Sequence, residues 1–322
     1  MAGSTYVPSA SRPTASSFYK RLRGGDEVAY LLTFACAVAI LVIVGLIVVE
    51  LWTNSQPTVK QFGLGFLWSS RWDPNGGHFG ALPFVYGTCV TAFLALLIAV
   101  PLGVAAAIFL AEMAPPRLSN ILTFLIELLA AVPSVIYGLI GIFVLVPIIR
   151  DYLVPVLTRL FGYLPIFSGD FYGVSFLSAG LVLSVMVVPF IISVSREVLL
   201  AVPVDQREAS LALGTTKWET TWQVVIPNAK TGIIGSIFLA LARALGETMA
   251  VTMVIGNTPK ITPSLLSPGY SIAAVIANEF AEASGNLYVS SLIFLGLVLF
   301  GLTIVINALA RILVLTTSRR RS

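Results

Sequence analysis

Residues 82–111, LPFVYGTCVTAFLALLIAVPLGVAAAIFLA, form an apolar stretch that contains no charged side chain. A helix needs about 20 apolar residues to cross a hydrocarbon core of about 30 Å, so this stretch is long enough to span a membrane. Five further runs have the same character, and one of them is interrupted by Arg243 and Glu247. They are residues 28–49, 128–149, 171–195, 231–259 and 283–310. The sequence therefore predicts an all-α integral membrane protein with six transmembrane helices.

Composition leads to the same conclusion. Of the 322 residues, 57% are hydrophobic and only 11% are charged, and the mean hydropathy is +0.94. These values exclude an ordinary soluble domain.

Cys36 and Cys89 fall in or near the apolar runs, which favours a role as small apolar packing residues over a disulfide or metal site. His78 has no cysteine or second histidine near it in the sequence, so we expect a solvated loop residue and no metal site.

The basic residues are distributed unevenly between the two predicted sides of the membrane. Of the 19 Lys and Arg residues, 13 fall on the side that holds both termini, five fall on the other side, and Arg243 lies inside a helix. Cytoplasmic segments carry the excess of basic residues in membrane proteins, so both termini are expected in the cytoplasm. The net charge of +4 reflects this bias, and we do not take it as a sign of nucleic-acid binding.

The order of polar and apolar segments suggests a domain plan. Residues 1–25 are rich in Ser, Thr, Pro and Gly and are expected to form a disordered cytoplasmic tail. The plan continues with a first transmembrane helix at 26–52, an outer loop at 53–80, a main transmembrane domain at 81–315 that includes a cytoplasmic loop at 203–227, and a basic tail at 316–322. The outer segment 150–170 is expected as a capped surface loop. The outer segment 260–285 shows helical spacing, which predicts a short helix on the outer face.

Residues 131–138, AVPSVIYG, place a proline in the third predicted helix. Proline frees a backbone carbonyl and bends a helix, as in helices that line transport pathways, but a simple packing kink explains it equally well. Glu127 precedes this bend by one to two turns. Either the bundle interior or the membrane interface is compatible with its position.

The cytoplasmic loop 203–227 has its own helical signals. Pro203 suits the first turn of a helix, and Asp205 favours the positive helix end. Gly214 suits a helix C-terminus, and residues 216–219, TKWE, match a capping box for a second short helix. Two short helices joined at a glycine form a stiff protrusion that another protein can grip. The alternative is an amphipathic helix resting on the membrane surface.

This loop resembles the E-A-A loop of bacterial ABC importer permeases. The matching residues are Glu208, Ala209, Ser210 and Gly214, followed by Ile226 and Pro227. The resemblance implies that the first four residues couple the chain to a cytoplasmic ATPase, whose cleft receives the loop. Ser210 stands where the commonest pattern has Ala, and its side chain is small enough for docking. The chain has no G-x-x-x-x-G-K-[ST] phosphate loop, so we expect no nucleotide site, no bound cofactor and no enzymatic activity of its own, with ATP used by a partner subunit.

Arg243 and Glu247 are the charges inside the fifth predicted helix, and their spacing places them on one helical face. Arg243 lies about 18 Å along this helix from Thr231, near mid-membrane. A charge there costs roughly 2.5–3.5 kcal/mol and usually faces a polar pathway or a partner. Guanidinium suits a tetrahedral oxyanion, and Glu247 either accepts a hydrogen bond from protonated phosphate or acts as the counter-ion of Arg243. A structural ion pair that fixes helix packing remains the alternative.

Four stretches resemble the PstC-type permeases of bacterial phosphate importers: residues 79–88, 127–138, 242–257 and 264–280. The resemblance implies a type I importer permease architecture in the bacterial inner membrane, with residues 53–80 in the periplasm. It also implies a second related permease (PstA-type), a pair of ATPase subunits (PstB-type) and an external phosphate-binding protein (PstS-type). The arginine and glutamate that this family associates with phosphate passage match Arg243 and Glu247.

These observations predict a permease that forms half of the pathway of an ATP-driven importer for inorganic phosphate. A permease for another oxyanion, such as sulfate or molybdate, would keep the same mechanical parts and change only the cargo. A secondary transporter driven by an ion gradient would show repeats and midplane ion ligands, which we do not find in the sequence.

Overall fold

The computed structural model describes residues 26–169 and 171–319, and the predicted tail at 1–25 lies outside them. Within these residues the regular elements are helices, apart from one isolated antiparallel bridge between Asp73 and His78. In the described part of the chain, six helical segments are long and apolar enough to cross a membrane, which agrees with the predicted number. They are Val28–Asn54, Leu82–Met113, Ser134–Phe161, Phe176–Leu200, Lys217–Gly246 and Asn286–Ile312.

The chain divides into two units between Thr53 and Asn54. The described part of the first unit consists of the helix α2 (Asp26–Asn54) up to Thr53, and the most apolar stretch of this helix has no side chain buried within the chain. A helix that is apolar on every face belongs in a hydrocarbon environment. This agrees with the first predicted transmembrane helix.

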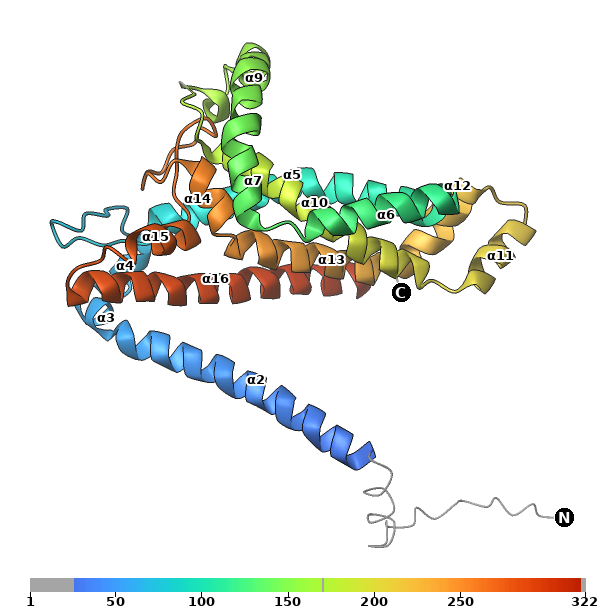
Figure 1. Ribbon diagram of the computed structural model, residues 1–322, viewed down its shortest axis with the longest axis horizontal. Coiled ribbons are helices and arrows are strands. Elements are labelled where there is room, and N and C mark those ends of the chain that lie inside the picture. Colours follow the sequence, from blue (N-terminus) through green and yellow to red (C-terminus); the bar gives the residue numbers. More distant parts are fainter. Residues whose placement is uncertain (1–25, 170, 320–322) are drawn as a thin grey trace, which may run out of the picture. The chain divides into compact units, whose positions relative to one another are not determined.

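The central helix of the second unit is α10 (Phe176–Leu200). In its most apolar stretch, 67% of the residues are buried. It packs against α5 (Leu82–Ile108), α6 (Pro116–Ala130), α13 (Ile226–Gly246) and α14 (Met249–Ile255) (Figure 1). The main core cluster joins α10 to α5, α13 and α14 with side chains such as Phe176, Leu183 and Leu245. The bundle is thus organised around a single buried helix.

The third transmembrane segment differs from the prediction. Helix α6 ends at Ala130, and a new helical run begins after Pro133, which has extended ψ (139°). This run comprises α7 (Ser134–Ile140), η2 (Gly141–Leu145), α8 (Val146–Ile148), η3 (Ile149–Leu153) and α9 (Val154–Phe161). The predictions of a helix at 128–149 and of a surface loop starting at 150 were therefore wrong. A proline ends the preceding helix but is tolerated in the first turn of the next one, where the prolines of α8 and α9 lie.

The fifth segment is also interrupted. It runs through α12 (Lys217–Thr220), η5 (Thr221–Val225) and α13, which ends at Gly246. Glu247 has an extended backbone (φ −69°, ψ 129°), and α14 begins at Met249. The prediction of one helix over residues 231–259 was therefore wrong, and so was the single helical face shared by Arg243 and Glu247. Gly246, a weak helix former, is the local signal for the break.

Two groups of connecting segments lie at opposite ends of the second unit (Figure 1). One end carries α11 (Val204–Ala212) and α12, close to η1 (Phe109–Met113). The other end carries α3 (Gln56–Phe62), α4 (Gly65–Trp68), α15 (Ile272–Glu279) and the start of α16 (Asn286–Arg319). The short 3₁₀ turn η4 (Pro165–Phe167) follows α9.

The short helix predicted within residues 260–285 is confirmed as α15, which packs against α5, α14 and α16. The segments 53–80 and 260–285, both predicted as outer, do lie at the same end. Trp72 Nε1 donates to Glu279 Oε2 (2.9 Å), and Tyr288 donates to the same oxygen (2.7 Å). Burial raises the pKa of Tyr270, which is consistent with a neutral phenol that accepts a hydrogen bond from Asn278. At the chain's C-terminal end, α16 includes the first part of the predicted tail 316–322, and residues 320–322 lie outside the described part.

Candidate translocation and coupling sites

Helix α11 begins directly after Pro203 and ends at Ala212, so the proline precedes the first turn that it was expected to occupy. Gly214 has φ +87°, the left-handed conformation that favours glycine, and its N–H donates to Leu211 O (2.9 Å). The predicted helix end at this glycine is confirmed. The predicted capping box is also present, since Thr216 and Glu219 exchange side-chain and backbone hydrogen bonds at the start of α12.

The exposed surface of α11 carries both polar and apolar side chains. Glu208 and Ala209 are exposed, and Val204 (60% exposed) and Leu213 (87%) add apolar surface near them. Ser210 and Arg207 face the other way, toward the protein. An exposed helix that combines apolar residues with a carboxylate is suited to contact with another protein. Of the four predicted coupling residues, Glu208, Ala209 and Gly214 are thus accessible, whereas Ser210 is buried.

Ser210 has a role that the sequence did not reveal. Its side chain is 8% exposed and lies 2.8 Å from Thr215 Oγ1, which in turn lies 2.9 Å from Thr220 Oγ1. Thr220 also donates to Ser210 Oγ (3.2 Å). This hydroxyl cluster (Ser210, Thr215 and Thr220) joins α11 to α12. Because alanine is the commonest residue at this position of the motif, the motif gave no signal for the cluster.

Arg207 connects α11 to the transmembrane helices. Its Nη2 lies 2.9 Å from Glu112 Oε1 in η1, and both side chains are mostly buried (17% and 11% exposed). The same guanidinium donates to Leu199 O (2.7 Å) in the last turn of α10 and to Val202 O just after this helix. A cation near the last carbonyls of a helix is favourable because these groups carry the negative end of the helix dipole. The sequence indicated Arg207 only as one of many cytoplasmic charges.

Arg243 lies in the last turn of α13 and is exposed on the surface of this chain. Its guanidinium carbon lies 5.8 Å from the centre of the Phe190 ring, within cation–π range. Among the described residues, no salt bridge joins Arg243 to Glu247. The ion pair considered as an alternative role for these two residues is therefore not formed, because the helix ends between them.

Glu247 occupies the junction between α13 and α14. Its Oε1 accepts a hydrogen bond from the backbone N–H of Ala250 (3.3 Å) in the first turn of α14. A carboxylate there satisfies one of the free N–H groups at the helix start and opposes the positive helix end. Arg243 thus lies at the C-terminal end of α13, where the helix dipole is negative. Glu247 lies before the N-terminal end of α14, where the helix dipole is positive. Discontinuous helices of this kind occur where membrane proteins line a polar cavity.

The predicted proline motif 131–138 lies next to this junction. Tyr137 and Gly138 are buried, and α7 packs against α14. The Tyr137 hydroxyl donates to Leu129 O (2.7 Å) in α6, across the break at Pro133. These contacts give the motif a packing role beside the Arg243 region.

Glu127 lies on α6 and is exposed within this chain. Within the described residues, no group of three or more His, Cys, Asp or Glu side chains is arranged to hold a metal ion.

Comparison with known proteins assigns a class to this helical arrangement. Residues 99–319 match the family described as "Binding-protein-dependent transport system inner membrane component". This match covers more than half of the chain, so the protein belongs to this family of transport permeases and is a multi-pass membrane protein.

Individual relatives narrow the class. The chain is 44% identical to the phosphate transport system permease protein PstC of Xylella fastidiosa (strain 9a5c), over 98% of each chain. It is 42% identical to PstC of Mesorhizobium japonicum (97% of this chain and 96% of the relative). It is 36% identical to a probable PstC of Methanocaldococcus jannaschii (89% and 93%). The resemblance to PstC-type permeases is confirmed. A solved structure of the MetNI methionine ABC transporter aligns with 72% of this chain and 93% of its own chain, at 18% identity and a TM-score of 0.46.

Proposed function

We propose that this chain is the transmembrane permease subunit of an ATP-driven importer for inorganic phosphate and forms half of its translocation pathway. The names of its relatives, which match it over nearly its whole length, support phosphate as the cargo. No observation on this chain favours sulfate, molybdate or an ion-driven mechanism. The proposal therefore keeps phosphate and the ABC importer mechanism.

The observation that carries the proposal is the position of Arg243. A guanidinium on the exposed face of an apolar helix is costly against lipid, so it is expected to face a partner or water. A second, related permease that covers this face would enclose Arg243 in a pathway shared by two subunits. The break after Gly246 supports the same interpretation, since irregular backbone at membrane depth is tolerated where it lines a cavity.

Arg243 has the chemistry for a transient contact with phosphate. Its planar donors engage two oxygens of a tetrahedral oxyanion at once. Because no carboxylate of the described residues forms a salt bridge with Arg243, an arriving anion has no such ion pair to displace. The contact with Phe190 supports the side chain while it is unoccupied. Glu247 uses Oε1 for Ala250 N–H, which leaves Oε2 to accept a hydrogen bond from protonated phosphate.

The driving force enters through α11 in this proposal. A cytoplasmic ATPase pair contacts the exposed residues Glu208 and Ala209, hydrolyses ATP and moves α11. Gly214 and the hydroxyl cluster keep α11 and α12 in a fixed relation, and Arg207 passes the displacement to α5 and α10. Rigid-body motion of these helices alternates access between the two sides of the membrane. This chain itself binds no nucleotide and no other cofactor.

The uneven distribution of basic residues gives the orientation. We place both termini and α11 in the cytoplasm of a bacterial cell, with the chain in the inner membrane. The end that carries α3, α4 and α15 then faces the periplasm, where an external binding protein delivers phosphate.

The test is phosphate uptake into proteoliposomes that contain this chain, its partner permease and the ATPase, supplied with the binding protein. Uptake of labelled phosphate is expected to require ATP. It is also expected to continue in the presence of sulfate or molybdate at roughly ten times the phosphate concentration. Uptake that continues without ATP but follows an imposed ion gradient would contradict the proposal. Strong competition by sulfate or molybdate would reassign the cargo.

A further inference from the structure

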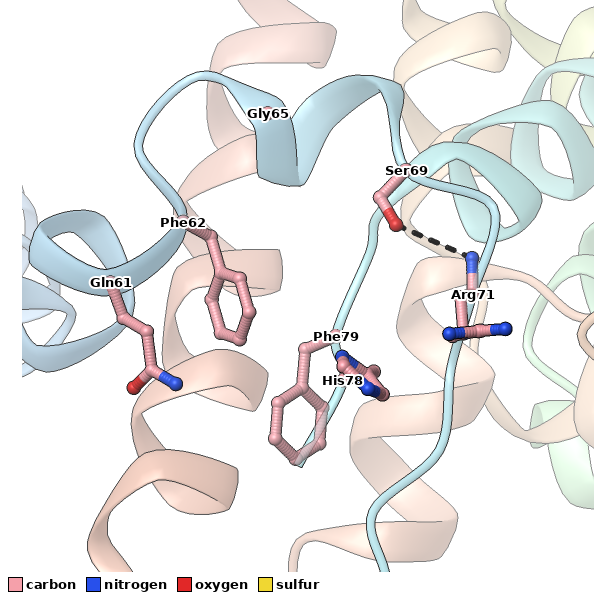
Figure 2. A pocket seen from close by; sticks show the side chains of 7 residues that line it. All are labelled: Gln61, Phe62, Gly65, Ser69, Arg71, His78 and Phe79. Atoms are coloured by element: carbon pink, nitrogen blue, oxygen red, sulfur yellow. Dashed lines mark hydrogen bonds between the residues drawn. The ribbon is translucent and has the colours of Figure 1, made fainter. Parts of the chain in front are cut away.

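A polar pocket of about 460 Å³ lies in the segment between α2 and α5. It is lined by Gln61, Phe62, Gly65, Ser69, Arg71, His78 and Phe79. Figure 2 shows Gln61 and Phe62 on one side of the view and Ser69 and Arg71 on the other, with His78 and Phe79 between them. The pocket precedes residue 99, where the match to the permease family begins. It is therefore a feature of this chain outside the family-matched region.

The charge of the pocket favours an anionic group. Its lining contains the guanidinium of Arg71, the imidazole of His78 and the amide of Gln61, but no carboxylate. Arg71 is exposed, and the salt bridges of the described residues do not include it. The nearby Asp73 is engaged in its own turn, where its Oδ1 accepts the N–H of Gly76 (3.0 Å). Within the described part of the chain, Arg71 is thus a cation without a salt-bridge partner.

The walls of the pocket are held by the surrounding structure. Phe79 is 3% exposed and contacts the ring of Trp72 edge-on at 5.0 Å. Asp73 and His78 exchange two backbone hydrogen bonds of 2.8 and 3.1 Å, and Ser69 Oγ accepts the N–H of Arg71 at 3.4 Å. A site that is ordered before its ligand arrives loses less conformational entropy when the ligand binds. The order of these walls therefore favours binding of a ligand in the pocket.

The surroundings point to a protein ligand. Leu64 and Trp68 beside the pocket are 78% and 77% exposed, and Trp and Arg are enriched at the energetic centres of protein interfaces. The pocket lies at the end of the second unit opposite α11 (Figure 1). Cavities of a few hundred Å³ hold groups larger than one tetrahedral ion, and aromatic walls suit the carbon atoms of a side chain.

We propose that this pocket receives an acidic side chain, Asp or Glu, from a surface loop of the external binding protein, with its carboxylate bound by Arg71. The inference rests on the proposed function, which supplies that binding protein at this end of the molecule. Gln61 and His78 give further hydrogen bonds, and Phe62 and Phe79 contact the aliphatic part of the loop. The charge pair would orient the delivering protein over the pathway and speed its encounter.

The experiment measures binding of the phosphate-loaded binding protein to the complete complex in nanodiscs, for wild type, Arg71→Glu and Lys60→Glu. Lys60 is the matched control, because it is an exposed cation in the same segment that does not line the pocket. Arg71→Glu is expected to weaken binding about tenfold or more, and Lys60→Glu less than about twofold. The difference between wild type and Arg71→Glu should shrink at 1 M salt, where the screening length is about 3 Å. Unchanged basal ATPase activity in each variant shows that the complex is assembled.

Two outcomes would overturn the docking role. One is equal affinity of wild type and Arg71→Glu for the binding protein. The other is loss of phosphate uptake in Arg71→Glu with normal affinity, which would assign the pocket to the free anion. Wild-type uptake measured in the same preparation separates this inference from the proposed function. If the wild type transports phosphate and only the Arg71 result is negative, the docking site alone is wrong.

Discussion

Arg207 Nη2 lies 2.9 Å from Glu112 Oε1, and this contact links two residues that are 95 positions apart in the chain. It joins α11 to the end of the α5–η1 helix, while two further bonds of the same guanidinium reach the carbonyls of Leu199 and Val202. One side chain thus connects α11 to two transmembrane helices. Both side chains of this ion pair are mostly buried, so removal of one leaves the other as a buried charge without its ionic partner, which is destabilising.

Arg207→Ala is expected to reduce phosphate uptake while the complex still assembles and hydrolyses ATP. Residues within a coupling network typically change coupling by 0.5–2 kcal/mol, which corresponds to a roughly 2- to 30-fold loss of phosphate transported per ATP. The measurement is the ratio of uptake to ATP hydrolysis in proteoliposomes. Arg117→Ala is the control, since Arg117 is an exposed arginine at the start of α6. An unchanged ratio in Arg207→Ala would show that force reaches the helices by another route.

Gly214→Ala tests the geometry between α11 and α12. Apart from its chain neighbours, no atom of the described residues lies within 4 Å of a Cβ added at Gly214, so the cost comes from φ +87° alone, about 1–2 kcal/mol. Gly285→Ala imposes the same backbone strain (φ +93°) before α16 and is the matched control. We expect Gly214→Ala to lower phosphate transported per ATP and Gly285→Ala to leave that ratio intact. Equal ratios in the two variants would argue against a mechanical role for Gly214.

Ser210→Ala removes one member of the hydroxyl cluster and leaves Thr215 and Thr220 bonded to each other. The expected cost is about 1 kcal/mol of stability, because one net hydrogen-bonding position is lost in a buried site. The readout is the midpoint of thermal unfolding of the purified complex, with exposed Ser70→Ala as the control. ATPase binding should persist, since alanine is common at this position of the motif. Loss of ATPase binding at normal stability would instead place Ser210 in the docking surface.

Gly87→Ala tests the close approach of α5 to the segment that precedes α15. An added Cβ would lie 2.1 Å from the carbonyl oxygen of Tyr270, which is backbone and has little freedom to move. Overpacking of this kind costs about 1–3 kcal/mol. Gly301→Ala, where no atom lies within 4 Å, is expected to be neutral or slightly stabilising in its helix. Comparable unfolding midpoints for the two variants would contradict this packing.

The sequence predicted the parts of the fold that depend on composition and local signals. The number of apolar runs agrees with the six membrane-length helical segments of the described residues, although two of the predicted ranges were wrong. The signals at Gly214 and Thr216 gave the correct helix end and capping box. It failed where the backbone responds to tertiary packing. The chain stays helical from Ser134 to Phe161 despite two prolines, and it leaves the helix at Glu247, where only Gly246 gave a signal.

The candidate site shows the same division. The sequence identified Arg243 and the exposed residues Glu208 and Ala209 of α11. The ion pair between Arg243 and Glu247, which the sequence left open as an alternative, is not formed among the described residues. The Arg207 contact with Glu112 and the hydroxyl cluster depend on residues brought together by folding. No spacing rule connects a carboxylate at the end of one apolar run with a guanidinium far along the chain.

The central claim is that Arg243 contacts phosphate on a route shared by two permeases. Its most direct test is ATP-driven uptake of labelled phosphate by complexes that carry Arg243→Gln, with exposed Arg159→Gln as the control. Our account predicts a loss of about tenfold or more in Arg243→Gln, because a charge-assisted, two-oxygen contact is removed, with normal assembly and ATPase activity. Arg243→Lys should retain part of the uptake, since it keeps the charge but not the planar fork. Uptake by Arg243→Gln at the rate of the control would contradict the account.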